Sequence, residues 1–187
     1  MADERNRMLE QLNTDDWQEC RQSVLIVDDS AMNRRMLTEI LGGRFDTAEA
    51  TSGEECLHLL EENRDGISIV LLDIHMEGMD GFAVLEEMDR QKMLEDIPVI
   101  MISSEDKVDA MRRAFDLGAS DYISRPFDAR VVCQRIGNTM RLYAKQRRLC
   151  AAVEKQIREA DQNGRIMLAL LNRVCLLYTS PSPRDRG

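Results

Sequence analysis

The sequence predicts an α/β fold in which helices flank a doubly wound, five-stranded parallel sheet. Short aliphatic and β-branched segments recur along the chain, helical patterns separate them, and most of them end at a charged or hydroxyl side chain. Continuous apolar runs are typical of strands that are buried on both faces, as they are in parallel sheets. The five predicted strands are residues 24–27, 45–50, 69–73, 99–102 and 122–124.

Capping residues and apolar spacing predict a helix after each strand. Ser30, Asp80 and Asp128 are candidate N-caps, and the S-x-x-E pattern from Ser52 to Glu55 is a capping box. Strands and helices therefore alternate. In such a sheet the carboxyl ends of the strands share one edge, which is where ligands bind.

The last predicted helix, which begins after Asp128, does not end at an ordinary length. This pattern predicts a long C-terminal helical extension that connects to another domain or dimerises. Coiled-coil pairing and a single connecting helix both stay open, because Gln146 interrupts the apolar seam. Gly164 is expected to break the helix, and residues 163–174 to begin another. The seam consists of Leu142, Leu149, Val153, Ile157 and Ala160.

The chain divides into four predicted parts. Residues 1–22 are a polar leader to which we assign no function, and residues 23–143 form the sheet domain. Residues 144–174 are a helical linker and the start of a further, truncated domain. Residues 175–187 match a translated sequencing adapter of the transposase-tagging type, and we exclude them from the fold.

Composition narrows the class of protein. The 187 residues carry a net charge of −9, which argues against nucleic acid as a partner. The five cysteines form no CxxC motif, and they predict reduced thiols. We find no signal peptide and no apolar run of membrane-spanning length, so we expect a cytoplasmic protein with no membrane partner.

Polar side chains at the strand ends predict a site for phosphoryl transfer. Asp28 and Asp29 follow the first strand, while Asp73, Ser103 and Arg125 follow the third, fourth and fifth. Two carboxylates about 4 Å apart repel by about 4 kcal/mol at an effective dielectric of 20, so one stays protonated or a cation joins them. Mg²⁺ suits such oxygen ligands, and a carboxylate beside it is a competent nucleophile. The hydroxyl group and the guanidinium would hold phosphoryl oxygens.

The run VLIVDDS…LLDIHMEGMDGF…VIMISS…GASDYISRPF resembles the receiver domain of two-component response regulators. The resemblance covers about residues 23–143 and implies a flavodoxin-like fold. It implies that Asp73 is the phosphoacceptor. It also implies that Asp29 binds Mg²⁺ directly, that Asp28 binds it through water, and that the backbone carbonyl of His75 is the third protein ligand.

The same resemblance identifies Ser103 as the switch hydroxyl and Tyr122 as the aromatic residue that moves with it. Two positions depart from the family pattern. Arg125 stands where the family has lysine, which keeps the charge but replaces a point charge by a planar fork. Glu77 stands where the family has proline, and we expect it to loosen that turn and add negative charge.

The implied function is a phosphorylation switch: a sensor histidine kinase or phosphotransfer protein phosphorylates Asp73, and the chain catalyses only its own phosphorylation and dephosphorylation. Further partners are a second copy through the C-terminal helix and an output domain similar to an HD-GYP phosphodiesterase or a diguanylate cyclase. A pseudo-receiver that only docks partners is the alternative suggested by Arg125 and Glu77. A Mg²⁺-dependent aspartyl phosphatase is disfavoured, because the chain lacks a D-x-D run at Asp28.

Overall fold

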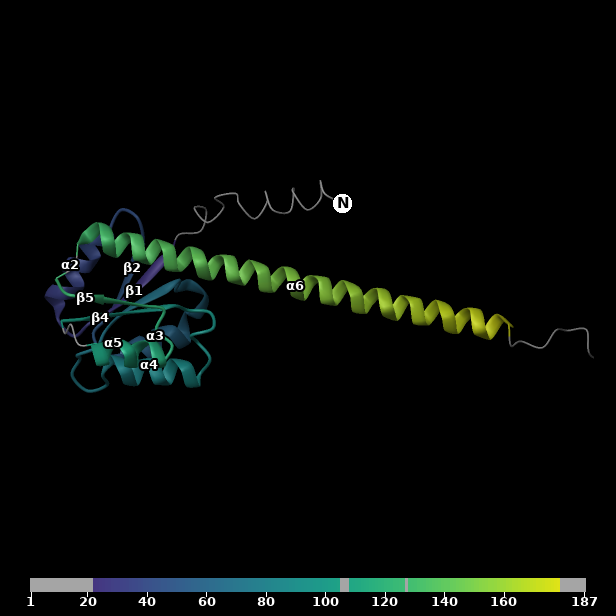
Figure 1. Cartoon of the computed structure of the whole chain (residues 1–187), viewed down its shortest axis with the longest axis horizontal. Coiled ribbons are helices and arrows are strands. Elements are labelled where there is room, and N and C mark those ends of the chain that lie inside the picture. The colour runs from purple at the N-terminus through teal and green to yellow at the C-terminus, as the bar shows by residue number, and fades with distance from the viewer. Residues whose placement is uncertain (1–21, 105–107, 127, 179–187) are drawn as a thin grey trace, which may run out of the picture. The chain divides into compact units, whose positions relative to one another are not determined.

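The computed structural model describes residues 22–104, 108–126 and 128–178, with side chains described as far as residue 160. Its centre is the predicted five-stranded parallel sheet (Figure 1), and its strand order is β2-β1-β3-β4-β5. The leader, apart from Gln22, and the end of the predicted adapter segment lie outside the described residues. The strands are β1 (Ser23–Val27), β2 (Asp46–Ala50), β3 (Ile69–Asp73), β4 (Val99–Ser103) and β5 (Asp121–Ser124).

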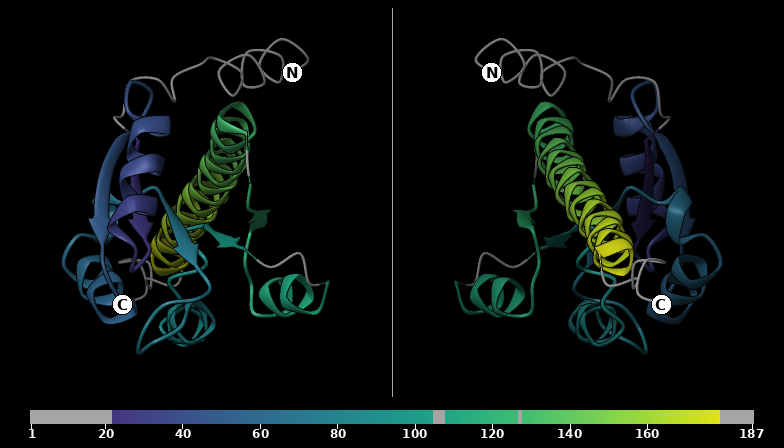
Figure 2. Two further views of the ribbon diagram at one scale, coloured as in Figure 1. Left: turned by 90° about the vertical axis from the view of Figure 1, so that its left-hand side faces the viewer. Right: turned by 90° about the vertical axis from the view of Figure 1, so that its right-hand side faces the viewer.

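Helices cover both faces of the sheet, because successive residues of each strand point to opposite sides. In β1, Leu25 and Val27 belong to one apolar cluster, while Val24 and Ile26 belong to the other. The first cluster packs under α3 (Gly53–Glu62), α4 (Gly81–Arg90) and α5 (Val108–Asp116). The second packs under α2 (Ala31–Leu41) and the first part of α6 (Ala129–Tyr178). These two layers can be followed in the end views of Figure 2.

Three of the four predicted caps form, and the fourth serves another purpose. Ser30 occupies the predicted N-cap position of α2, but its side chain makes no capping hydrogen bond. Its backbone N–H instead donates to Oδ1 of Asp28 at 2.9 Å, and this bond connects the turn before α2 to the carboxylate at the end of β1. In the other three, a side-chain oxygen accepts a backbone N–H of the first turn: Ser52 from Glu55, Asp80 from Ala83, and Asp128 from Arg130.

The long C-terminal helix is confirmed, and it is longer than predicted. Helix α6 runs without interruption from Ala129 to Tyr178, so the expected break at Gly164 and the separate helix after it were wrong. One glycine costs a helix only about 1 kcal/mol, which does not end it. The helix also enters residues 175–178, which we excluded from the fold on account of their origin.

Helix α6 belongs to both of the compact units into which the chain divides, Met1–Lys145 and Gln146–Gly187. Within the first unit Val132, Ile136 and Met140 are buried against the sheet, as their spacing predicts. Among the helices that the structure describes, none combines the length and apolar character of a membrane span. The large side chains of the predicted seam, Leu142, Leu149, Val153 and Ile157, are exposed to 63%, 47%, 55% and 64%.

Candidate functional site

The carboxyl ends of β1, β3, β4 and β5 meet at one edge of the sheet and bring distant polar residues together. The strand register pairs Val27 with Leu72, Asp73 with Ile102, and Ser103 with Ser124. The side chains at these ends are withdrawn from solvent: the exposed fractions are 1% for Asp28, 4% for Asp73 and 0% for Ser103. The predicted convergence of these three residues is therefore present in the fold.

Arg125 joins two of the carboxylates from the end of β5. Its Nη2 donates to Oδ2 of Asp28 at 2.6 Å, and its Nη1 lies 3.2 Å from Oδ1 of Asp73. The backbone N–H of Arg125 donates to the carbonyl of Ser103 at 2.7 Å, which fixes where the side chain leaves β5. A single guanidinium thus pairs with carboxylates at the ends of β1 and β3.

Asp28 is held by three protein donors. Besides Arg125 on Oδ2, its Oδ1 accepts the Ser30 backbone N–H at 2.9 Å and the side-chain amide of Asn33 at 3.1 Å. These donors tie the Asp28 carboxylate to the end of β5 and to the first turns of α2. Sequence reasoning missed Asn33, because a single amide inside a helix forms no recognisable motif.

Asp29 is exposed and bonds to the loop that follows β3. Its Oδ2 accepts the backbone N–H of Glu77 at 3.0 Å. Proline has no N–H, so this bond depends on the departure from the family pattern at Glu77. We expected Glu77 to loosen the turn, whereas its backbone ties the turn to Asp29. Arg34, also missed from the sequence, donates to the backbone carbonyls of Asp28 and Asp29 at 2.8 and 3.2 Å.

Asp73 is the least satisfied carboxylate at this edge. Burial raises its pKa to about 6; Arg125 opposes that shift, the Asp28 charge adds to it, and the backbone N–H of His75 opposes it. Among the described residues, the buried side-chain nitrogen and oxygen atoms without a hydrogen-bond partner are Asp73 Oδ1 and Arg125 Nε. Asp73 is thus mostly ionised at neutral pH and has an oxygen that can accept a further partner.

The donors at this edge fit a hard divalent cation with few protein ligands. Within the described residues, no group of three or more His, Cys, Asp or Glu side chains is arranged to hold a metal ion. Mg²⁺ does not require such a group, since it keeps several waters and binds through one or two carboxylates. Asp29 and Asp73 are the carboxylates predicted to fill this role, and His75, in the exposed loop two residues past Asp73, is the position predicted to add a carbonyl.

Two further predicted residues lie in the interior beside this edge. Ser103 is fully buried at the end of β4, and Tyr122 on β5 is only 8% exposed. Tyr122 belongs to the apolar cluster under α3, α4 and α5, so its ring lies inward in this structure. Tyr122, the predicted switch aromatic, is therefore in an inward position in this structure.

Gly81 lets α4 begin directly against the end of β3. A Cβ atom at this position would lie 2.2 Å from the Asp73 carbonyl oxygen, far inside contact distance. The Gly81 N–H donates to the Ile74 carbonyl at 2.9 Å, which closes the loop containing His75 and Glu77. The glycine thus sets the position of the loop that carries the predicted carbonyl ligand.

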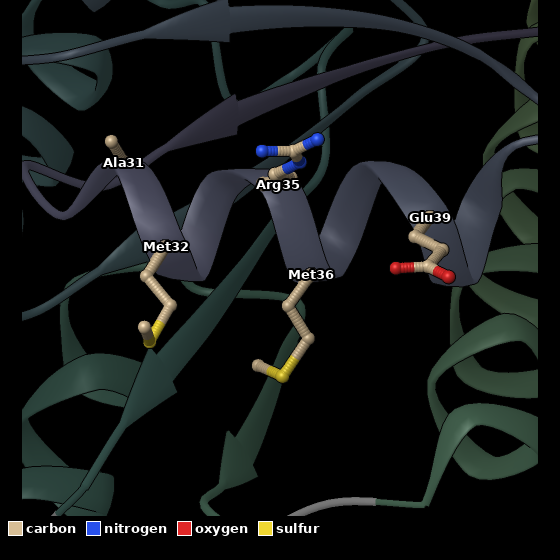
Figure 3. A pocket seen from close by; sticks show the side chains of 5 residues that line it. All are labelled: Ala31, Met32, Arg35, Met36 and Glu39. Carbon is tan, nitrogen blue, oxygen red and sulfur yellow. The ribbon is translucent and has the colours of Figure 1, made fainter.

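A hollow on the surface of α2 is a different feature. Figure 3 shows the side chains that line it, among which there is one carboxylate and one guanidinium. It includes none of the strand-end residues, and Met32 on its rim is 81% exposed. We therefore assign the chemistry to the strand ends rather than to this hollow, which is lined by Ala31, Met32, Arg35, Met36 and Glu39.

Comparisons with known proteins agree with this geometry. The heme response regulator HssR of Staphylococcus aureus (strain bovine RF122 / ET3-1) is 34% identical over 122 residues, 65% of this chain and 52% of HssR. The chain thus spans about half the length of this relative. In the CheX-CheY-BeF3-Mg+2 complex from Borrelia burgdorferi, a chain 36% identical matches with a TM-score of 0.57, covering 62% of this chain and 86% of that one.

A more distant structure supports the fold. The signal receiver domain of a LuxO repressor protein from Vibrio parahaemolyticus matches with a TM-score of 0.65 at 18% identity, covering 70% of this chain and 98% of that domain. Residues 24–137, more than half of the chain, match the response regulator receiver domain family. The strand-end residues described above lie inside that match, and the chain belongs to the receiver domain family of two-component response regulators.

Proposed function

We propose that Asp73 accepts a phosphoryl group from a phosphohistidine of a sensor histidine kinase or phosphotransfer protein in the cytoplasm. The observation that carries this proposal is the buried Asp73 carboxylate, which has an oxygen without a hydrogen-bond donor and faces the cationic Arg125. A nucleophile needs such an oxygen, and the arriving phosphoryl group needs positive charge beside it.

The transfer conserves atoms and electrons without a further reactant. A carboxylate oxygen of Asp73 attacks phosphorus, a P–O bond forms, and the P–N bond of the donor breaks, leaving its electron pair on the imidazole nitrogen. Although burial raises the pKa of Asp73 to about 6, this value is below neutral pH, so most Asp73 side chains are ionised there. Mg²⁺ held by Asp29, Asp73 and the His75 carbonyl, with Asp28 behind them, would offset the charge between carboxylate and phosphoryl oxygens.

Ser103 and Tyr122 form the proposed switch. The new phosphoryl group would draw the buried Ser103 hydroxyl toward the Asp73 side chain and hold the Tyr122 ring in its inward position. Two contacts connect the beginning of β5 to α6: Ser120 Oγ and Tyr143 Oη lie 2.9 Å apart, and Arg135 pairs with Asp121 at 2.6 Å. A movement of β5 would therefore reach α6 directly.

The long helix is the proposed route to partners beyond the receiver domain. Its exposed apolar residues Leu142, Leu149, Val153 and Ile157 suit a second copy of the chain or a following segment. We propose that α6 leads into an output domain, of the HD-GYP phosphodiesterase or diguanylate cyclase type by analogy, as the sequence predicts.

The experiment that tests the phosphoacceptor is labelling with a small phosphodonor in the presence of Mg²⁺. We expect the wild-type chain to gain one phosphoryl group that hydroxylamine releases, as it does from an acyl phosphate, and the Asp73→Asn variant to gain none. Asp96→Asn is the matched control, because Asp96 pairs with Arg64 at 2.9 Å outside the strand-end site, and it should be labelled like the wild type. Labelling that persists in Asp73→Asn would contradict the proposal.

A receiver that docks partners without phosphorylation is the second candidate. The Arg125 contacts to Asp28 and Asp73 favour it, because they neutralise these carboxylates within the protein. Folded wild-type chain that neither binds Mg²⁺ nor takes up phosphoryl groups would select this candidate over the phosphoacceptor.

A further inference from the structure

Arg125 acts on two strand-end carboxylates through two different nitrogen atoms. Nη2 lies 2.6 Å from Asp28 Oδ2, and Nη1 lies 3.2 Å from Asp73 Oδ1. The planar guanidinium can face both groups at once, whereas the ammonium group of lysine is one point charge on a flexible stem. The Arg125 side chain is only 19% exposed, so solvent and salt screen these contacts weakly.

Glu77 adds a second protein contact to the same set of carboxylates. Its backbone N–H occupies Oδ2 of Asp29, and a proline at this position would leave that oxygen without the donor. Each of Asp28, Asp29 and Asp73 therefore faces a cation or a donor of the chain itself.

We propose that Arg125 competes with Mg²⁺ for the strand-end carboxylates and, with Glu77, sets a low Mg²⁺ affinity for this receiver. This inference rests on the proposed function, in which the same carboxylates hold the metal. A divalent cation that arrives at Asp73 meets a fixed positive charge 3.2 Å from the carboxylate oxygen. Binding must either tolerate this repulsion or displace the guanidinium and lose its charge-assisted contacts. Phosphorylation of Asp73 would then require a higher Mg²⁺ concentration than in a chain with lysine at this position.

The test is direct measurement of Mg²⁺ binding to the full chain by calorimetric titration. Arg125→Lys keeps the charge but gives up one of the two guanidinium contacts. We expect it to lower the Mg²⁺ dissociation constant about tenfold, which corresponds to about 1.4 kcal/mol. Glu77→Pro removes the N–H donor to Asp29 together with the Glu77 carboxylate, so it is compared with Glu77→Ala, which removes the carboxylate and keeps the N–H; the proline variant should have the lower constant of the two. Arg64→Lys is the matched control, because Arg64 pairs with Asp96 away from the site, and it should bind Mg²⁺ like the wild type.

Thermal unfolding provides a second measurement that does not depend on phosphorylation. In EDTA, Arg125→Lys should unfold at a lower temperature than the wild type, because the metal-free protein loses a buried contact. Mg²⁺ should then raise its unfolding temperature by more than it raises that of the wild type, since tighter binding stabilises the folded state further.

The outcomes separate this inference from the proposed function. Equal Mg²⁺ affinity in the wild type and in Arg125→Lys, with Asp73 still labelled, would overturn the inference and leave the phosphoacceptor in place. Absence of Mg²⁺ binding in both proteins would overturn both. Binding that tightens in Arg125→Lys and not in Arg64→Lys would support the competition.

Discussion

Replacing Asp73 by asparagine should stabilise the metal-free protein at neutral pH and have little such effect in acid. Burial raises the Asp73 pKa from its usual 3.8 to about 6. At about 1.36 kcal/mol for each pKa unit, ionised Asp73 lowers the free energy of unfolding by about 3 kcal/mol above its folded pKa. Asparagine keeps the shape of the side chain and cannot ionise, so Asp73→Asn removes this cost.

The sign of the pH dependence follows from proton binding. Between about pH 4 and about pH 6, folded Asp73 holds a proton that the unfolded chain has released, so the wild type loses stability as the pH rises through this window. The stability difference between Asp73→Asn and the wild type should therefore grow from about pH 4 and level off above about pH 7.

Urea unfolding in EDTA, followed by circular dichroism across this pH range, measures the difference. Tyr143→Phe is a suitable control, because it removes the hydrogen bond between Tyr143 and Ser120 but no carboxyl group, and its stability change should be the same at each pH between these limits. A difference between Asp73→Asn and the wild type that stays constant from about pH 4 to about pH 8 would refute a raised Asp73 pKa.

Two further predictions concern local geometry. Gly81→Ala should lower the free energy of unfolding by about 2 kcal/mol or more and reduce Asp73 labelling, because its Cβ would lie 2.2 Å from the Asp73 carbonyl oxygen. Gly137→Ala on α6, whose Cβ would meet nothing within 4 Å, should instead raise the free energy of unfolding by about 0.5–1 kcal/mol. Urea unfolding measures the change in each variant. Equal changes in the two variants would contradict the steric argument. Ser52→Ala removes the cap that accepts the Glu55 N–H and should cost about 1 kcal/mol in the same assay without changing labelling; an unchanged midpoint would show that the cap contributes nothing.

The sheet and the strand-end site could be predicted from the sequence because both follow from two general rules, the apolar character of buried strands and the parallel pairing of those strands. Strands buried on both faces appear as continuous apolar runs, and in β3 every residue is buried up to Asp73, where the run ends. Parallel pairing then brings the residues at the strand ends together, whatever their separation along the chain. The site residues predicted from this rule alone were Asp28, Asp29, Asp73, Ser103 and Arg125.

Other features depend on contacts that no short pattern encodes. Asn33 and Arg34 bind Asp28 and the neighbouring backbone from α2, and such bonds follow from where the helix lies rather than from spacing. The bond from Glu77 to Asp29 uses a backbone N–H, so the side chain gave no sign of it. Apolar spacing also leaves open how much of a helix is covered: on α5, Val108 and Phe115 are 61% and 46% exposed.

Whether Asp29 and Asp73 share one metal can be measured directly by nuclear magnetic resonance with Mn²⁺ as a paramagnetic substitute for Mg²⁺. We expect Mn²⁺ to broaden the amide resonances of Asp29, Asp73 and the loop as far as Glu77 together, and excess Mg²⁺ to restore them. The resonances of Ser23 and Ile69, at the opposite ends of β1 and β3, should broaden less at the same Mn²⁺ concentration. Broadening at Asp29 without broadening at Asp73, or at neither residue, would contradict a shared metal site at the strand ends.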